Sequence, residues 1–352
     1  MKWFLSFLGI ITIGWLSLNA STASEAYSFA QIPDSKIKGM ALTAPPNPLS
    51  GNEPYTKPLA ELGINWVSVQ PFGFFKKNQP QVWFNSPRQW WGERPEGIAT
   101  CVAAAKAANM KILLKPQLWS HEQWIGHLDF PEEDSASIET WKTQYRDYAL
   151  FWAKLADSLD IEMYCIGTEI EQLAKKQETY WRQLIAEIRT VYKGQLTYAS
   201  NWDSFEEIAF WDALDFIGID AYFPLCPKKT PKVKTLKKAW QEPFQRIKTL
   251  QQKFGKPVIF TEFGYLSVDA CAHKHWELEP KRASLASNEK AQANAIQALL
   301  EVFGQEDWWM GGFQWKWHID PSTSAMEGPP ANDYTPNGKL SEEILKKYYK
   351  VN

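Results

Sequence analysis

The sequence predicts a single α/β domain folded as a (β/α)8 TIM barrel. Eight short apolar segments alternate with segments of helical periodicity along the chain, and no low-complexity linker or internal repeat divides them. The 352 residues suffice for one such barrel or for two ordinary domains. A doubly wound sheet is the main alternative, but no Gly-rich phosphate-binding loop follows any expected strand.

The N-terminus is expected to be a targeting segment. Lys2 precedes a mostly apolar run over residues 3–18, and small residues follow as far as Ser24. We therefore expect a signal peptide over residues 1–24, with an uncleaved membrane anchor as the alternative, and the catalytic barrel over residues 36–352. The protein is then expected to be secreted, periplasmic or exposed at the cell surface.

The eight expected strands are apolar segments bounded by turn residues. They cover residues 37–43, 66–72, 111–119, 161–169, 195–201, 216–223, 257–265 and 312–317. Helical spacing predicts helices over residues 141–159 and 184–192, a long helix over 234–254 that ends at Gly255, a helix over 288–303 capped by Ser287, and a short last helix after Ser341. The proline-rich stretch 44–58 is expected to be the first loop after a strand.

Composition restricts the partners. The net charge is −2 and no basic stripe is visible, which argues against nucleic acid as a partner. The four cysteines form no CxxC pair and no His/Asp cluster stands out, so neither a metal nor a cofactor is expected, and no obligate protein partner is evident. Cys226 and Cys271 both follow strand ends, so they are expected either to form a disulfide with each other or to remain free thiols. Cys101 and Cys165 are expected to be buried free thiols.

Aromatic residues gather where the expected strands end. The chain has 19 Trp, and an indole either fills a large core or stacks on the C–H face of a sugar. Barrel active sites form at the carboxyl ends of the strands. Those ends carry Trp119, Trp202, Trp315 and Trp317, and the loop after the second strand adds Trp83, Phe84, Trp90 and Trp91. This placement favours a carbohydrate-binding cleft.

Two of the expected strands end on a glutamate. Glu169 closes the fourth strand and Glu262 lies in the seventh, which is the pair that a two-carboxylate glycosidase on a barrel needs. A single glutamate at a strand end would be read as an ordinary solvated charge. Two of them, with Tyr222 at the end of the sixth strand expected to lie between them, favour a functional site. Strict alternation along a strand then puts Gly167 and Cys165 on the face of Glu169. By the same rule Phe260 and Gly264 share the face of Glu262.

Several segments together resemble the large clan of retaining glycosidases with (β/α)8 barrels and, within it, glycoside hydrolase family 113, whose described members are β-mannanases. They are Lys38-Gly39-Met40, Trp66-Val67-Ser68-Val69, Ile112-Leu113-Leu114-Lys115-Pro116, Ile166-Gly167-Thr168-Glu169, Asp215 to Tyr222, Thr261-Glu262-Phe263-Gly264-Tyr265 and Asp333 to Lys339. The resemblance implies that Glu169 is the general acid/base, that Glu262 is the nucleophile, and that Tyr222 donates to the nucleophile.

One position departs from the clan pattern. Many clan members have an Asn immediately before the acid/base, where it binds the sugar 2-hydroxyl, and this chain has Thr168. Asn201, at the end of the fifth strand, is the candidate replacement. Trp317 or Trp315 is the candidate platform under the sugar at the cleavage point, and Trp119 is a further substrate-binding candidate. Lys115, on the face of Trp119, is expected either near the site or paired with an acid of the barrel.

The leading hypothesis is an exported endo-β-1,4-mannanase that acts on a β-linked polysaccharide or oligosaccharide by double displacement. Another β-glycosidase of the same clan, such as a β-glucanase or an exo-acting enzyme, is the first alternative. A non-catalytic carbohydrate-binding barrel is the second, and the pair of glutamates argues against it because a binding protein needs neither.

Overall fold

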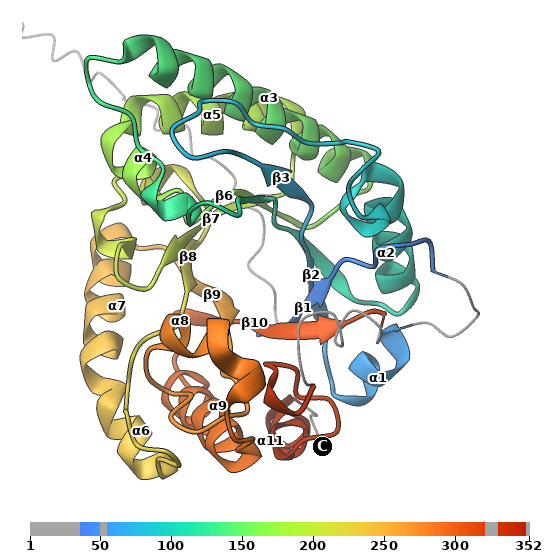
Figure 1. Ribbon diagram of the computed structural model, residues 1–352, viewed down its shortest axis with the longest axis vertical. Helices are drawn as coiled ribbons and strands as arrows, with labels where there is room; N and C mark the ends of the chain where they lie inside the picture. Colours follow the sequence, from blue (N-terminus) through green and yellow to red (C-terminus); the bar gives the residue numbers. More distant parts are fainter. Residues whose placement is uncertain (1–35, 50–54, 321–329, 350–352) are drawn as a thin grey trace, which may run out of the picture. The chain divides into compact units, whose positions relative to one another are not determined.

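Eight parallel strands close into a barrel in the computed structural model, which describes residues 36–49, 55–320 and 330–349 (Figure 1). The order around the barrel is β1-β10-β9-β8-β7-β6-β4-β2. The strands are β1 Ile37–Thr43, β2 Trp66–Val69, β4 Lys111–Leu114, β6 Met163–Thr168, β7 Gln195–Asn201, β8 Ile217–Asp220, β9 Val258–Phe263 and β10 Trp309–His318. The predicted (β/α)8 fold is confirmed, whereas the expected leader over residues 1–24 lies outside the described residues.

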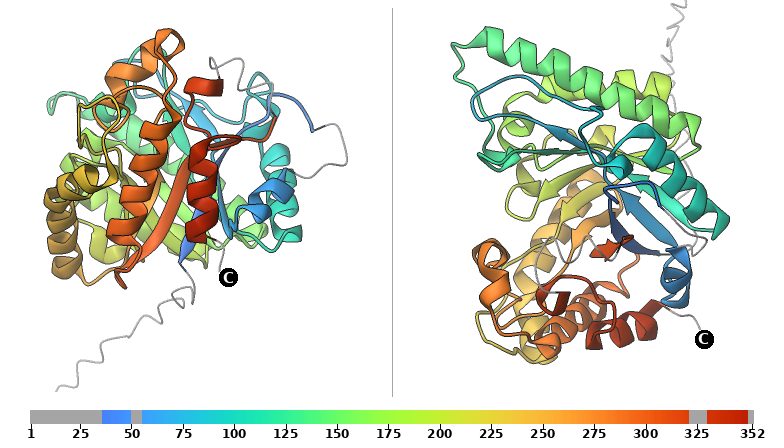
Figure 2. Two further views of the ribbon diagram at one scale, coloured as in Figure 1. Left: turned by 90° about the horizontal axis from the view of Figure 1, so that it is seen from below. Right: turned by 45° about the vertical axis from the view of Figure 1, so that its right-hand side comes forward.

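Helices cover the outside of the barrel. The α-helices of the described residues are α1 Thr56–Glu61, α2 Pro95–Ala107, α3 Ser135–Ser158, α4 Glu171–Lys176, α5 Glu178–Val191, α6 Val233–Ala239, α7 Gln241–Phe254, the short α8 His275–Leu278 in a loop after β9, α9 Glu289–Phe303 and α11 Leu340–Tyr349. Two of them, α9 and α11, run side by side along the barrel wall (Figure 2). Across the part of the chain that the structure describes, no helix combines the length and apolar character needed to cross a membrane.

Two of the expected strands are interrupted at prolines. The second barrel strand stops before Pro71 and the third before Pro116, and proline has no N–H to continue a hydrogen-bond ladder. Beyond each proline the chain resumes as a short strand, β3 (Phe72–Phe74) and β5 (Gln117–Trp119). These two pair in a separate sheet beyond the barrel wall. The interruption therefore lifts the end of each strand out of the barrel and over its mouth.

Two helix predictions need correction. The helix expected over residues 234–254 is two helices, α6 and α7, because Pro243 near the start of α7 has no N–H to bond to the preceding turn. Its predicted end at Gly255 is confirmed, with the glycine in the left-handed conformation at φ +64°. The N-cap of α9 is Asn288 rather than Ser287, since the Asn288 side chain accepts from the Ala291 N–H at 3.0 Å.

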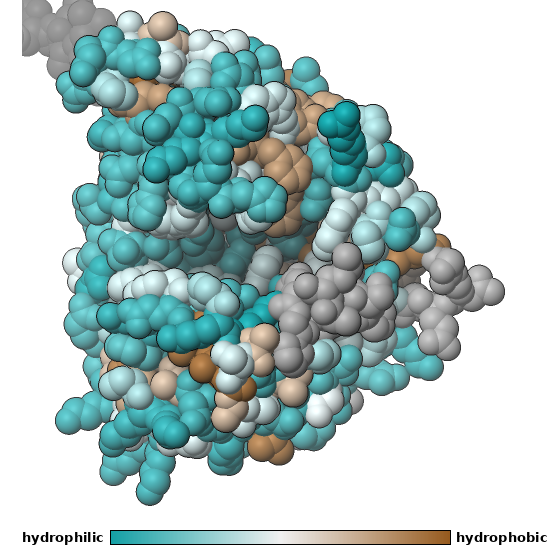
Figure 3. All heavy atoms as spheres, in the orientation of Figure 1, coloured by the Kyte–Doolittle hydropathy of each residue, from teal (hydrophilic) through white to brown (hydrophobic). Residues whose placement is uncertain are grey.

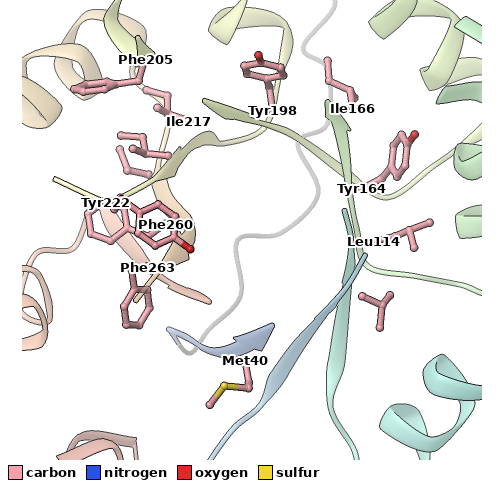
Figure 4. Close-up of a cluster of buried hydrophobic side chains, with 14 of the residues drawn as sticks. Met40, Leu114, Tyr164, Ile166, Tyr198, Phe205, Ile217, Tyr222, Phe260 and Phe263 are labelled. Atoms are coloured by element: carbon pink, nitrogen blue, oxygen red, sulfur yellow. The ribbon is translucent and has the colours of Figure 1, made fainter. Parts of the chain in front are cut away.

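The core has two layers. Inside the barrel, alternate strand residues form a small apolar cluster of Ile37, Trp66, Leu113, Met163, Cys165, Ala199, Phe216, Ile259, Met310 and Phe313. A larger cluster fills the space between strands and helices, and Figure 4 shows its strand residues Leu114, Tyr164, Tyr198 and Phe260 around the barrel. Three helix indoles, Trp141, Trp152 and Trp181, are fully buried there. All four cysteines are buried free thiols, so the structure contains no Cys226–Cys271 disulfide.

Candidate active site

Glu169 stands at the end of β6 in a strained backbone conformation. Its φ is +54°, and its N–H donates to the Ala199 carbonyl of β7 at 2.8 Å. A left-handed conformation at a residue other than glycine costs about 1–3 kcal/mol and persists where the surrounding structure imposes it, which is common at functional sites. The turn separates Glu169 from the regular alternation of the strand and projects it from the end of β6.

A register shift precedes each glutamate, so the expectation from strict alternation is wrong. On β6 the shift lies between Cys165 and Thr168. The Cys165 side chain lies inside the barrel, while a Cβ at Gly167 would lie 2.8 Å from the Tyr145 hydroxyl of the surrounding helix α3. A β-bulge of this kind inserts a residue and redirects the next side chain. Gly167 therefore does not share the face of Cys165.

The same irregularity occurs on β9. The pairing with β8 shifts between Phe260 and Glu262. The Phe260 ring packs outward, 4.9 Å from Phe303 of α9, while Ile259 belongs to the inner cluster. Phe260 thus does not share the face of Glu262, and the bulge turns the carboxylate toward the barrel axis.

Three donors converge on the carboxylate of Glu262. Lys115 Nζ lies 2.5 Å from Oε1, Gln117 Nε2 lies 3.0 Å from the same oxygen, and the Tyr222 hydroxyl donates to Oε2 at 2.7 Å. Glu262 itself is only 8% exposed. Charge-assisted hydrogen bonds to both oxygens hold the carboxylate in one orientation.

Lys115 satisfies both expectations that the sequence left open. It contacts Glu262, and its ammonium also lies 3.6 Å from the Asp220 carboxylate of β8. Burial alone would lower the pKa of Lys115, but the negative charges of Asp220 and Glu262 outweigh that effect and raise it. The pKa of Asp220 is raised because the carboxyl is fully buried, an effect that Lys115 opposes. A buried cation thus stands between two buried acids, which is stable only while its partners stay in place.

Glu169 has a different environment. The indole of Trp124 donates to its carboxylate, with Nε1 2.7 Å from Oε2. Burial and the negative charge of Glu262 raise the pKa of Glu169 to about 7, although the Trp124 hydrogen bond and the more distant Lys115 pull it down. A buried carboxyl with a raised pKa can hold a proton near neutral pH, which is what the acid of a two-carboxylate site needs.

A cleft of about 880 Å³ opens beside Glu169. Figure 3 shows the face of the molecule that carries α8, hollowed near its centre. The cleft is lined by Leu118, Trp119, Ser120, His121, Glu122, Gln123, Trp124, Ile125, His127, Glu169, Asn201, Trp202, Asp203, His275, Trp276, Glu279 and Pro280. Apolar rings with a few polar groups make a surface suited to a sugar chain.

Two predicted substrate residues, Trp119 and Asn201, lie in this cleft. Trp119 is 41% exposed, and the centroid of its ring lies 4.0 Å from that of His121. The Asn201 amide donates to Asp203 at 2.8 Å, so a loop carboxylate orients it at the end of β7. Both side chains are therefore placed beside Glu169.

The other predicted substrate residues lie outside the cleft lining. Thr168 is buried, and its hydroxyl donates to the Pro116 carbonyl at 3.1 Å. Trp317 is 5% exposed and belongs to the outer apolar cluster, which leaves it little surface to offer a sugar. Trp315 is half-buried beside the strand of Glu262, so close that a Cβ at Gly264 would lie 2.6 Å from its carbonyl oxygen.

Sequence reasoning missed two cleft residues on α8. The ring of His275 lies 4.5 Å from that of Tyr222, and burial lowers its pKa to about 4, so it is neutral near pH 7. Trp276 is 43% exposed and stacks on Trp202, with centroids 5.8 Å apart and ring planes 9° apart. The His-Trp pair lies in the loop after β9, as other aromatic residues lie in the loops after other strands. This placement could have predicted that His275 and Trp276 belong to the cleft. No group of three or more His, Cys, Asp or Glu side chains in the described ranges could hold a metal ion.

Comparison with known families decides what kind of enzyme this barrel is. The sequence profile of glycoside hydrolase family 113 matches residues 53–350. The chain belongs to glycoside hydrolase family 113. The family and the fold that the resemblance implied are thus confirmed, and the protein is a glycoside hydrolase. No curated protein sequence matches the chain significantly.

Solved structures agree with the family assignment. The family 113 β-mannanase AaManA from Alicyclobacillus acidocaldarius, in complex with ManMIm, shares 26% identity over 90% of this chain and 97% of its own, with a TM-score of 0.76. A further family 113 β-1,4-mannanase shares 25% identity over 90% of this chain and 100% of its own, with a TM-score of 0.75. Fungal β-1,4-galactanases, at 15% identity over 89% of this chain and 98% of theirs and a TM-score of 0.55, share only the fold.

Proposed function

We propose that this family 113 enzyme is a retaining glycoside hydrolase that cleaves β-1,4-mannosidic bonds in mannan-type polysaccharide. The observation that carries the proposal is the contrast between its two carboxylates. Glu262 receives three donors, one of them cationic, whereas burial and the neighbouring negative charge raise the pKa of Glu169 to about 7. Support for the substrate comes from two family 113 solved structures described as β-mannanases.

The first step forms a covalent intermediate. The ionised Glu262 carboxylate attacks the anomeric carbon while Glu169 gives its proton to the glycosidic oxygen, so that the C–O bond breaks and the leaving sugar departs neutral. Lys115, Gln117 and Tyr222 hold the attacking carboxylate in one orientation, which lowers the entropic cost of the attack. Trp315, half-buried beside the strand of Glu262, is the proposed platform beneath the reacting sugar.

The second step releases the intermediate. Glu169, now ionised, removes a proton from water, and the oxygen of that water attacks the anomeric carbon and displaces Glu262. Two inversions give net retention. In this scheme Asn201 takes the contact with the 2-hydroxyl that the clan assigns to an Asn before the acid/base, because the Thr168 hydroxyl already donates to Pro116.

Azide rescue of the nucleophile variant tests the mechanism. With an activated aryl β-mannoside, Glu262→Ala should lose turnover, and sodium azide should restore it by filling the vacated space and giving the α-mannosyl azide. Glu169→Ala with azide should instead give the β-azide. Glu171→Ala, a matched control outside the cleft, should keep wild-type turnover. Wild-type turnover in Glu262→Ala, or an inverted product from the unmodified enzyme, would refute the mechanism.

A polysaccharide panel tests the substrate. Reducing-end release should be greatest on mannan and glucomannan, and sizing of the early products should show internal cleavage. Equal activity on cellulose would favour a broader β-glucanase, and release of monosaccharide alone would favour an exo-acting enzyme. Binding to mannan without any release would favour the non-catalytic alternative.

Export is the remaining part of the proposal and depends on the N-terminal sequence. The apolar run over residues 3–18, followed by small residues, is typical of a signal peptide. Expression of the full chain should give a mature protein outside the cytoplasm that lacks about the first 20–24 residues. An intact N-terminus in the membrane fraction would favour the uncleaved anchor.

A further inference from the structure

Three aromatic side chains form a row across the small sheet beyond the barrel mouth. Phe74 of β3 pairs in parallel register with Trp119 of β5. On its other side Phe74 forms an antiparallel bridge with Trp83, closed by backbone hydrogen bonds of 2.7 and 2.9 Å. Residues directly opposite one another in a sheet carry their side chains on the same face. The rings of Trp83, Phe74 and Trp119 therefore lie along one face of this sheet.

The two ends of the row are open to solvent. Trp83 is 42% and Trp119 41% exposed, and both belong to the few large apolar side chains that are exposed within the described ranges. Phe74 between them is half-buried, with its ring edge-on to Trp119 at a centroid distance of 6.2 Å. Exposed indoles aligned in a row fill no core, and grouped exposed apolar side chains mark a binding surface.

The row leads out of the catalytic cleft into a second hollow. Trp119 lines the cleft beside Glu169, whereas Phe74 and Trp83 line a separate hollow of about 530 Å³ together with Val82, Phe84, Ser86, Arg88 and Gln89. Neighbouring strands lie about 4.8 Å apart, so the backbones of Trp83 and Trp119 are about 10 Å apart across the row. This span is comparable with the length of a disaccharide unit.

The polar groups around the outer hollow suit an uncharged hydroxylated ligand. The exposed Arg88 and the hydroxyl of Ser86 lie along its wall, and the ammonium of Lys76 lies 5.8 Å from the centre of the Trp83 ring. The Lys76 ammonium covers one face of the Trp83 ring, and the exposed remainder of the indole is left for stacking on a sugar.

We propose that the row of Trp83, Phe74 and Trp119 binds the polysaccharide beyond the catalytic cleft, as a distal site for the chain that is being cleaved. The inference rests on the proposed function and names no new chemistry. Its ligand is the continuation of the same β-linked, uncharged chain, because the row begins at a residue of the cleft. The enzyme then favours long chains over short ones through stacking at Trp83.

The test uses the full chain with Glu262→Ala, so that binding is measured without hydrolysis. Calorimetry should show that Trp83→Ala weakens binding of a long β-1,4-mannooligosaccharide about tenfold, which is the loss expected for one stacked ring, and leaves binding of mannobiose unchanged. In the active enzyme the same substitution should raise KM for polymeric mannan and leave kcat on an aryl β-mannoside unchanged. Leu340→Ala, an exposed apolar residue on α11, serves as control and should change neither quantity.

The outcomes separate this inference from the proposed function. If Glu262→Ala binds long mannooligosaccharides and Trp83→Ala binds them equally well, the distal site is refuted and the proposed function stands. If Glu262→Ala binds no mannan but binds another β-glycan, the proposed substrate fails, and the same comparison on that glycan then decides the distal site. If Trp83→Ala abolishes self-association in ultracentrifugation without changing polysaccharide affinity, the row is a contact between copies and the inference is overturned.

Discussion

The hydrogen bond from Trp124 to Glu169 should set the alkaline limit of activity. Glu169 acts as an acid only while protonated, so kcat/KM should be full below its pKa and fall as the pH rises through about 7. The Trp124 indole donates at 2.7 Å to the carboxylate and so stabilises the ionised form, which lowers that pKa. Trp124→Phe keeps an aromatic ring and removes the donor, and the alkaline limit should therefore move to higher pH.

The size of the shift follows from the strength of the hydrogen bond. A hydrogen bond to a charged group contributes about 1.5–3 kcal/mol, and one pKa unit corresponds to about 1.4 kcal/mol. The limit should therefore rise by about one pH unit or more. The assay is the pH profile of kcat/KM on an aryl β-mannoside, checked by a ¹³C NMR titration of the Glu169 carboxyl. Trp119→Phe alters another indole of the same cleft and should leave the limit in place. An unchanged limit in Trp124→Phe, or a shift to lower pH, would refute the reasoning.

Three further predictions concern stability. Lys115→Met leaves Asp220 and Glu262 buried without their cation, so the free energy of unfolding in chemical denaturation should fall by about 3–5 kcal/mol. The double variant Lys115→Met/Asp220→Asn should recover part of this loss. A loss no larger than that of the exposed Lys193→Met would contradict the ion-pair argument. Gly167→Ala should cost about 1–3 kcal/mol, because its Cβ would lie 2.8 Å from the Tyr145 hydroxyl and 3.0 Å from Trp181, and wild-type thermal stability would show that α3 and α5 move aside freely. Burial alone would raise the pKa of Asp333, but the hydrogen bond with His318 at 2.6 Å and the charge of Lys316 hold that pKa at about 2. About 2 kcal/mol of stability should therefore be present above pH 4 and disappear as the pH falls from about 4 to about 2. The stability of Asp333→Asn should depend less steeply on pH in this range, and an unchanged slope would exclude Asp333 as the source of the pH dependence.

The sequence predicted the barrel and its two glutamates because both depend on local patterns. An apolar strand that ends on Glu169, or that carries Glu262, is visible in a few consecutive residues. The direction of those side chains was not visible, because a bulge on each strand breaks the alternation on which the prediction relied. The hydrogen bond from Trp124 to Glu169 was not predictable either, since that contact depends on the path of a loop.

The prolines after the second and third barrel strands explain more of the site than their role as strand breakers suggests. Lys115 immediately precedes Pro116 and Gln117 follows it, and both donate to the same oxygen of Glu262. Lys115 and Gln117 are separated by one position and therefore share a face of the chain. The break at Pro116 leaves Lys115 at the end of the barrel strand and places Gln117 at the start of β5.

The same break raises Trp119 over the cleft. Pro116 thus lies between Lys115, which orients the nucleophile, and Trp119, at which the proposed polysaccharide-binding row begins. The acid/base takes its donor Trp124 from a loop instead. Displacement of that loop should therefore change the pKa of Glu169 while the contacts of Glu262 remain, which is why the alkaline limit is the most sensitive measure of how the cleft is assembled.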